Sequence, residues 1–513
     1  MLRYSRNSLL DIGFFAIALI AAYAVAQYIR SDAIFDLLYI GMIILGAVVF
    51  VVILEDWRRG VYLFLTWLLF EDLVRKYLGN NMAVYFAKDA LAIILYISFF
   101  RTMRAKRIER FKIPFLVPLL LFFWLCLIQV FNPASPSVWY GILGLRIYFL
   151  YVPLIYIGYT FIDSEDDLQG LFSFVSFLIL VVAGLGIVQS IIGPSFLNPE
   201  HLQEDIRELS TLYRSSSSGL AYRPTSVFVS AGRLQDFLVV AWIVSLGHTS
   251  YLMLRHRRGR MLAFTALAVV AGASLMSTSR GVFMWNVGIA LLFAVGFLWG
   301  APWRQSEAIR VLRTTFRVIF FSGSAIVLLI VLFPGAVRSR LEIYYNTLMP
   351  TSPNSELVLR THTYPMQQLG RAFDSSRWVY GNGTGTSSLG LQYVSRIMGA
   401  PPTPGGGGET GFGNLVVELG VLGLGLWIVL GLAIIISAWK VVTKLRGTPW
   451  LPLVLAILVY AIVLCFPMTY SGFSYQDFLM NAFFWLLLGM LYRLKLFPKA
   501  FQIAHPEGGS GRG

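Results

Sequence analysis

The sequence predicts an all-α polytopic membrane protein with about 12–14 transmembrane helices. Its 513 residues are 57% hydrophobic and only 13% charged, whereas about 25% of the residues in a soluble domain are charged. The mean hydropathy of +0.70 points the same way. The apolar residues form solid runs of about 17 or more, while a membrane β-strand alternates apolar and polar residues over ~10 positions. A barrel is therefore excluded.

Each apolar run is close to the ~20 residues that a helix needs to cross ~30 Å of hydrocarbon. The first run follows Arg3 and Arg6 and has no small-residue cleavage site after it, so we expect a helix and not a removed signal peptide. The predicted spans cover about 9–28, 34–54, 60–77, 83–100, 113–131, 142–162, 168–192, 235–254, 261–277, 281–300, 316–334, 413–438, 449–466 and 477–492.

Basic residues gather in alternate loops, which predicts the orientation. One set of loops carries bursts at positions 3–6, 58–59, 101–107, 255–260, 304–313, 440–446 and 493–499. Positive charge marks the cytoplasmic side, so both termini are expected inside. The acidic loop 163–167 is the exception, and acidic residues contribute little to this rule. The same pattern explains the net charge of +15, and we expect no nucleic-acid partner.

This topology places two long loops, 193–234 and 335–412, on the outer side. We therefore divide the chain into a transmembrane bundle (1–334, including the loop 193–234), a large outer loop over the active site (335–412), C-terminal transmembrane helices (413–492) and a flexible cytoplasmic tail (493–513). Within the first loop, residues 200–208 are expected to form a surface helix. The two cysteines, Cys126 and Cys465, lie in apolar runs and predict neither a disulfide nor a thiolate metal site. We expect no metal and no cofactor.

Four cations lie inside or at the ends of predicted spans, where charge is expensive and suggests function. These are Lys88, Arg146, Arg223 and Arg280. Three of them also have a named simpler explanation: Arg146 could snorkel to the headgroups, Lys88 could pair with Asp89, and Arg280 could anchor the membrane interface. Considered together, Arg146, Arg223 and Arg280 are expected at one depth on the outer face. Converging guanidinium groups repel unless an anion lies among them, and their planar fork suits phosphate. A pyrophosphate at headgroup level is the predicted ligand.

The outer loop 335–412 adds further candidates. The glycine run Gly381–Gly385 is either a phosphate cradle of backbone amides or a simple turn. Glu409 precedes a predicted helix. It is either a charge that stabilises the helix dipole or a general base. His362 is either a surface histidine or a catalyst.

Several motifs resemble the superfamily of O-antigen ligases and Wzy-type polysaccharide polymerases, over about residues 70–490. They are Arg75-Lys-Tyr with Lys88-Asp89, Asn132-Pro, Gly144-Leu-Arg146, Arg223-Pro-Thr-Ser-Val-Phe, Ser277-Thr-Ser-Arg280-Gly and the glycine-rich helix after the large loop. The ligase signature begins with a histidine. That histidine and the residue after it are followed by nine residues, a glycine, two residues and a final small residue. This chain keeps the spacing from Glu409-Thr410 to Gly420-Val-Leu-Gly423. Glu409 replaces the histidine, which favours the polymerase branch.

The resemblance implies a bacterial inner-membrane glycosyltransferase of the GT-C type, metal-independent and inverting, with its site on the periplasmic side. The donor would be a saccharide on undecaprenyl pyrophosphate, polymerised into a surface polysaccharide or exopolysaccharide. The alternatives are a ligase that transfers polysaccharide to lipid A core as acceptor, and a transporter of lipid-linked oligosaccharides. The expected roles are Glu409 as catalyst, Arg223 and Arg280 as pyrophosphate ligands, Arg146 and Arg360 as support, and His362 and Lys88 as secondary candidates.

Overall fold

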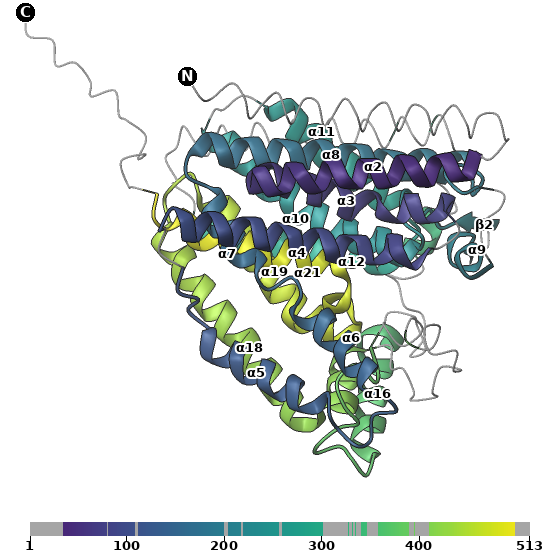
Figure 1. Ribbon diagram of the computed structural model, residues 1–513. Helices are drawn as coiled ribbons and strands as arrows, with labels where there is room; N and C mark the ends of the chain where they lie inside the picture. The colour runs from purple at the N-terminus through teal and green to yellow at the C-terminus, as the bar shows by residue number, and fades with distance from the viewer. Residues whose placement is uncertain are drawn as a thin grey trace, which may run out of the picture. The chain divides into compact units, whose positions relative to one another are not determined.

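The computed structural model describes residues 34–78, 81–107, 111–199, 204–216, 219–255, 259–300, 340–345, 358–388 and 410–497, together with Val327, Val331, Pro334 and Val394. The predicted spans 9–28 and 316–334 lie outside these residues, apart from those three isolated positions in the second. Every other predicted span overlaps a described helix. Figure 1 labels the described helices and strands.

The chain divides into two compact units. The first comprises residues 1–65 and 90–107, and includes α2 (Ile34–Glu55), the start of α3 (Trp57–Tyr77) and most of α4 (Met82–Ala105). Its packing is aromatic and aliphatic: the Trp57 and Phe99 rings meet edge to face with centroids 5.1 Å apart. The second unit comprises residues 66–89 and 108–513, and it contains both candidate sites described below.

Helices of membrane-spanning length dominate the described chain, which confirms the predicted class of an all-α, membrane-embedded protein. Seven of them are long and apolar enough to cross a bilayer. These are α4, the pair α6 (Val138–Phe149) and α7 (Leu154–Phe161), α8 (Glu165–Ile192), α10 (Ala231–Arg255), α12 (Arg280–Gly300), α18 (Gly411–Lys444), and α19 (Leu451–Val463) with its continuation to Ser471.

Shorter apolar helices complete the second unit. They are α5 (Leu116–Gln129), α11 (Arg260–Met276) and α21 (Phe478–Leu494). Close pairs include α7 with α21, α8 with α11, α10 with α19, and α5 with α18; the last pair runs side by side in Figure 1. Glycines let α7 and α21 touch, because a Cβ at Gly158 would lie 2.0 Å from the Leu486 carbonyl oxygen.

Polar contacts sort the helix ends of the second unit into two groups, as alternating spans require. At one end, Arg493 pairs with Asp163, and Arg255 pairs with Glu165. At the opposite end, Thr225 is bonded to Lys76 near the end of α3. Arg340 is bonded to Ser190 and Met276, near the ends of α8 and α11. The first group coincides with the loops that the sequence assigns to the cytoplasm. Which group faces the cytoplasm remains a prediction from charge.

The loop 193–234 contains a feature that the sequence did not predict. The helix α9 (Glu204–Ser210) overlaps the expected surface helix, but a hairpin follows it, formed by β1 (Tyr213–Ser216) and β2 (Gly219–Tyr222). The strands are antiparallel, with Tyr213 opposite Tyr222 and Arg214 opposite Ala221. Four-residue strands with serines at the turn carry too little apolar alternation to stand out in a sequence.

The long helix α18 is broken at Gly420, whose φ of 71° is non-helical. Residues 378–383 bond to the broken turn. Asn382 N–H donates to the Val417 carbonyl (2.8 Å), Gly383 N–H donates to the Glu418 carbonyl (2.9 Å), and Val421 N–H donates to the Trp378 carbonyl (2.8 Å). Residues 378–383 therefore satisfy the backbone N–H and C=O groups that the break leaves without partners in the helix.

Replacing Gly420 tests this arrangement. In Gly420→Ala, the new Cβ would lie 2.0 Å from the Val379 carbonyl oxygen. The backbone of Gly420, with φ 71° and ψ −174°, lies in a region essentially limited to glycine, which adds a penalty of ~1–3 kcal/mol. We expect a clear fall in the thermal unfolding midpoint of the detergent-purified protein. A Cβ added at Gly425 of the same helix would meet nothing within 4 Å, so Gly425→Ala is the matched control. Equal thermal unfolding midpoints of the two variants would contradict the claim that position 420 requires glycine.

Candidate functional site

The Arg223 turn leads from the hairpin into α10. The Arg223 N–H donates to the Leu212 carbonyl (3.0 Å), which ties the start of the turn to the residue before β1. Two residues further on, Thr225 and Ser226 are fully buried. The Gln189 side-chain oxygen on α8 accepts from both of their amides, at 2.8 Å and 2.6 Å. Ser226 has a φ of 52°, an uncommon conformation for a residue with a side chain.

Helix α3 holds the same turn from another side. The Lys76 Nζ atom donates to the Thr225 hydroxyl and to the Ser226 carbonyl, both at 2.9 Å. The Asp72 carboxylate accepts from the Val229 amide at 3.3 Å. Both Lys76 and Asp72 are buried. Contacts from two helices thus fix the backbone that carries Arg223.

The Arg280 turn joins α11 to α12. Thr278 has a φ of 56° and is fully buried, which is a clear outlier for a β-branched residue. The Ser279 hydroxyl accepts from the Val282 amide (3.4 Å) and caps α12. Arg280 is the first residue of that helix. A cation is unfavourable at this positive end of the helix dipole, whereas an anion is favourable.

Two more arginines bind the Arg280 turn. Arg214 on β1 donates from Nη1 to the Thr278 carbonyl (3.1 Å). Arg340 donates from Nε to the Met276 carbonyl (3.0 Å) and from Nη2 to the Ser190 hydroxyl (2.9 Å). These contacts orient the guanidinium groups through oxygens that carry no formal charge. The hairpin that ends in Arg223 is therefore bonded to the turn that ends in Arg280. We call Arg214, Arg223, Arg280 and Arg340 the arginine cluster.

Two tyrosines stabilise this region as hydrogen-bond donors. The Tyr344 hydroxyl contacts the Ser274 and Leu275 carbonyls, both at 3.0 Å, at the C-terminal end of α11. The Tyr222 hydroxyl donates to the Ser210 carbonyl at 2.8 Å. Burial raises the pKa of Tyr344 to about 12 and the pKa of Tyr222 to about 12. Both hydroxyls therefore keep their protons at physiological pH. Burial also lowers the pKa of Arg340, although a guanidinium stays charged in proteins.

A second group of charges lies between α3, α4, α6 and α10. Lys88 pairs with Glu71 (2.8 Å), and both are fully buried. Arg146 pairs through Nε with Asp89 (2.6 Å). We call this group the Tyr85 cluster, because the Tyr85 ring lies against three of its cations, with Lys88 Nζ 3.7 Å from the ring centroid. The other two, Arg75 and Arg146, each lie 5.0 Å from it.

Asp72 links the Tyr85 cluster to the Arg223 turn. Its carboxylate pairs with Arg75 (3.0 Å) and with Arg233 of α10, while also accepting from the Val229 amide. A buried ion pair with one partner removed costs ~3–5 kcal/mol, so these pairs hold their helices in one arrangement.

The structure brings together some of the predicted site residues. The turns carrying Arg223 and Arg280 meet through the hairpin. Arg146 belongs to the Tyr85 cluster instead, where Asp89 and the Tyr85 hydroxyl (3.2 Å) engage its guanidinium. The simpler explanation for Lys88 needs correction, because Glu71 and not Asp89 is its hydrogen-bonded partner.

The remaining predicted candidates are less well placed. His362 is exposed, within the π-helical turn η1 (Leu359–Thr363). Glu409 and the side chain of Arg360 lie outside the described residues. Among the described residues, no group of three or more histidine, cysteine or acidic side chains is placed to hold a metal ion.

The glycine run has a structural use that sequence reasoning missed. Glu418 of α18 is fully buried, and its carboxylate accepts from the Gly385 amide (3.0 Å), the Ser387 amide (3.1 Å) and the Tyr148 hydroxyl (3.1 Å). The amides at 382 and 383 bond to α18 carbonyls. With these amides committed to α18, the simple-turn interpretation of Gly381–Gly385 is favoured over a phosphate cradle. The signal in the sequence was a lone glutamate inside a glycine-rich apolar helix.

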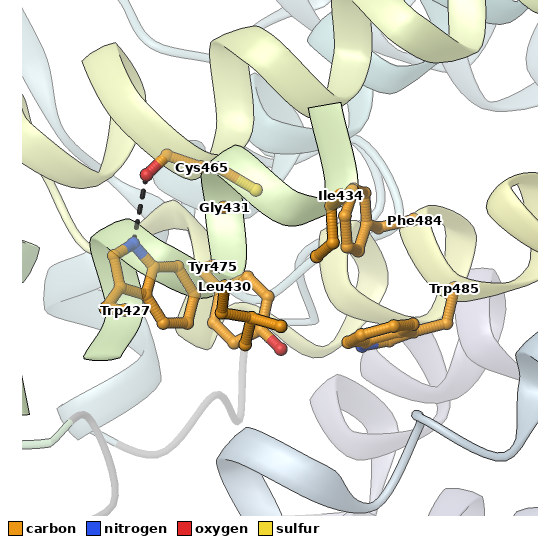
Figure 2. A pocket seen from close by; sticks show the side chains of 8 residues that line it. All are labelled: Trp427, Leu430, Gly431, Ile434, Cys465, Tyr475, Phe484 and Trp485. Atoms are coloured by element: carbon orange, nitrogen blue, oxygen red, sulfur yellow. Dashed lines mark hydrogen bonds between the residues drawn. The ribbon is translucent and has the colours of Figure 1, made fainter. Parts of the chain in front are cut away.

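A small apolar pocket lies where α18 faces α21 and the residues just before it (Figure 2). Its lining is Trp427, Leu430, Gly431, Ile434, Cys465, Tyr475, Phe484 and Trp485. The Trp427 indole donates to the Cys465 carbonyl at 3.0 Å, as the dashed line in Figure 2 marks. The pocket shares no residue with the arginine cluster or the Tyr85 cluster, and none of its lining residues is charged.

The support of the Arg223 turn can be tested at Gln189. In Gln189→Leu, the buried amides of Thr225 and Ser226 lose their shared acceptor, at a cost of roughly 2–6 kcal/mol for two unsatisfied donors. We expect a lower midpoint of thermal unfolding in detergent. The preceding residue, Val188, is 40% exposed, so Val188→Ala should change the midpoint little. A Gln189→Leu variant as stable as Val188→Ala would show that the turn does not depend on this contact.

Comparison with known proteins adds no family assignment to this geometry. No protein-family model matches the chain, and no curated protein matches it.

Proposed function

We propose that this protein is a membrane glycosyltransferase that moves a saccharide from undecaprenyl pyrophosphate to an acceptor at the outer leaflet. One observation carries the proposal: the two arginine turns, at Arg223 and Arg280, are bonded together at one end of the helix bundle through Arg214 and Thr278. The resemblance of these two turns to those of Wzy-type polymerases and O-antigen ligases supplies the reaction class.

The arginine cluster suits a departing diphosphate. Negative charge builds up on the pyrophosphate as its bond to the sugar breaks, and cations held in place beforehand stabilise that charge without reorganising. Arginine can grip two phosphate oxygens at once. The N-terminus of α12 adds its dipole at the position of Arg280. Arg223 and Arg280 are therefore the proposed ligands, with Arg214 and Arg340 orienting the turns that carry them.

Backbone strain supports the same location. Ser226 and Thr278 have positive φ values of 52° and 56°, one in each turn, and both are fully buried. Conformations of this kind cost ~1–3 kcal/mol and persist where surrounding contacts enforce them, which is common at functional sites. The contacts from Gln189, Lys76 and Arg214 supply that enforcement.

In the proposed reaction, the acceptor hydroxyl oxygen attacks the anomeric carbon from the face opposite the pyrophosphate. The bond from that carbon to the pyrophosphate oxygen breaks, and undecaprenyl pyrophosphate leaves with the electron pair. Glu409 takes the hydroxyl proton. Its neighbour Thr410 caps α18, accepting from the Gly413 amide at 3.3 Å, so Glu409 immediately precedes the helix cap.

The proposed branch is polymerisation, because Glu409 stands where the ligase signature has a histidine. Proteoliposomes containing the protein and one lipid-linked repeat unit separate the two branches. Elongation without any added acceptor supports the polymerase, whereas transfer only after lipid A core is supplied supports the ligase. No transfer under either condition would contradict both.

Arg280→Lys tests the diphosphate grip. Lysine keeps the charge but loses the planar fork, so we expect a fall in turnover of roughly 10²-fold or more, in line with the loss of one transition-state donor. The matched control is Arg371→Lys, at an exposed arginine of the loop helix α16 (Tyr364–Asp374). Wild-type turnover in Arg280→Lys would rule out a bidentate role.

Glu409→Gln tests the base. A carboxamide cannot accept the proton, and a general base contributes roughly 10²–10⁴-fold, so turnover should fall by that order while donor binding persists. The exposed Glu208 of α9 offers a control in Glu208→Gln. Unchanged turnover in Glu409→Gln would leave Glu409 as a helix-end charge and move attention to His362.

A further inference from the structure

The short helix α16 has an apolar surface wider than its packed face. Pro365 and Ala372 are buried, on the side that packs against α18. Met366 and Phe373, seven positions apart on the next flank, are 51% and 37% exposed. At 3.6 residues per turn, these two lie on one line along the helix. The polar positions Gln367, Arg371 and Asp374 form a separate strip beyond it, and all three are exposed.

The exposed apolar flank continues into the residues after α16. Trp378 is 41% exposed and Tyr380 is 69% exposed, and the Trp378 ring meets the Phe373 ring with centroids 5.9 Å apart. Exposed aromatic residues of this kind mark an interaction surface when they gather in one place. We call Met366, Phe373, Trp378 and Tyr380 the aromatic flank.

Hydrogen bonds attach the aromatic flank to the end of α5. The Gln129 amide donates to the Tyr380 carbonyl (2.7 Å), and the Asn132 amide donates to the Gly381 carbonyl (3.2 Å). The Thr384 hydroxyl donates to the Cys126 carbonyl at 2.7 Å. Tyr380 is thereby fixed at the level where α5 ends.

Helix α5 has a stripe of exposed apolar residues that indicates its lipid-facing side. Its exposed apolar residues recur at intervals of three and four, which is one stripe of a helix. The stripe consists of Val117, Leu121, Trp124, Ile128 and, just past the helix end, Phe131, exposed by 68%, 52%, 56%, 67% and 69%. In a membrane-embedded helix such a stripe faces the acyl chains. The aromatic flank therefore begins where the lipid-facing stripe of α5 ends.

We propose that α16 and residues 378–380 lie in the headgroup region of the bilayer, with the aromatic flank inserted among the lipids. Tryptophan and tyrosine concentrate at this level in membrane proteins, and an amphipathic helix binds there through its apolar side. Arg371 and Arg377, both exposed, are available to lipid phosphates. The occupant is a phospholipid surface. This inference rests on the membrane-embedded fold and holds whether or not the protein transfers sugars.

Depth-dependent fluorescence quenching tests this placement. The full-length variant Phe373→Cys, labelled with an environment-sensitive thiol dye, is reconstituted in phospholipid nanodiscs. Arg371→Cys on the polar strip is the matched control. Unmutated protein measures background labelling, which should be low because Cys126 and Cys465 are buried. Nitroxides placed near the headgroup or deep in the acyl chain report depth, and iodide reports water.

We expect the Phe373→Cys dye to be quenched by the shallow nitroxide at least about twofold more than the Arg371→Cys dye, and to be quenched less by iodide. Iodide access equal to that of the control would overturn the proposal. A dye shielded from iodide yet insensitive to both nitroxides would also overturn it, since another protein segment or a saccharide would then cover the flank. Normal size-exclusion profiles of both variants establish that they are folded.

Discussion

A charge buried in a membrane protein must find a partner, and this requirement organises the second unit. Helix α3 carries Glu71, Asp72, Arg75 and Lys76 within six residues, all of them buried. Asp72 engages Arg75, Arg233 and the Val229 amide, and Lys76 holds the turn after Arg223. Removing any one of these would strand a buried charge, at a cost of ~3–5 kcal/mol. The Arg223 turn is thus held by buried charges of α3, and the position of Arg223 follows from a helix far away in sequence.

The two charge groups divide the work differently. In the Tyr85 cluster, cations form ion pairs with carboxylates, Lys88 with Glu71 and Arg146 with Asp89. These ion pairs hold helices together. In the arginine cluster, Arg214 and Arg340 contact the Arg280 turn through carbonyl and hydroxyl oxygens. The first set of contacts joins helices to one another, and the second joins the hairpin and residues 340–344 to the turn before α12.

Hydropathy was enough to predict the fold class and most helices, because a bilayer demands long apolar runs whatever their neighbours. It also placed Arg223 and Arg280 at the same end of the bundle. Pairing was harder to predict: Lys88 precedes Asp89 in sequence, but one helical step turns their side chains apart, and Lys88 reaches Glu71 on α3 while Asp89 faces Arg146. The hairpin was missed because its strands are too short to show a period. The role of Glu418 was missed because it depends on contacts with segments far away in sequence, which periodicity does not encode.

The break at Gly420 has a consequence for how α18 fits a bilayer. At 1.5 Å per residue, its 34 residues would extend ~51 Å as one rod, far beyond a hydrocarbon thickness of ~30 Å. A continuous rod would have to tilt steeply or deform the surrounding lipid. Interrupted at Gly420, the portion from Val421 onward matches the slab by itself, at ~36 Å with a modest slant. The nine residues before Gly420 are therefore not needed to cross the hydrocarbon, so this helix can match the bilayer without a steep tilt.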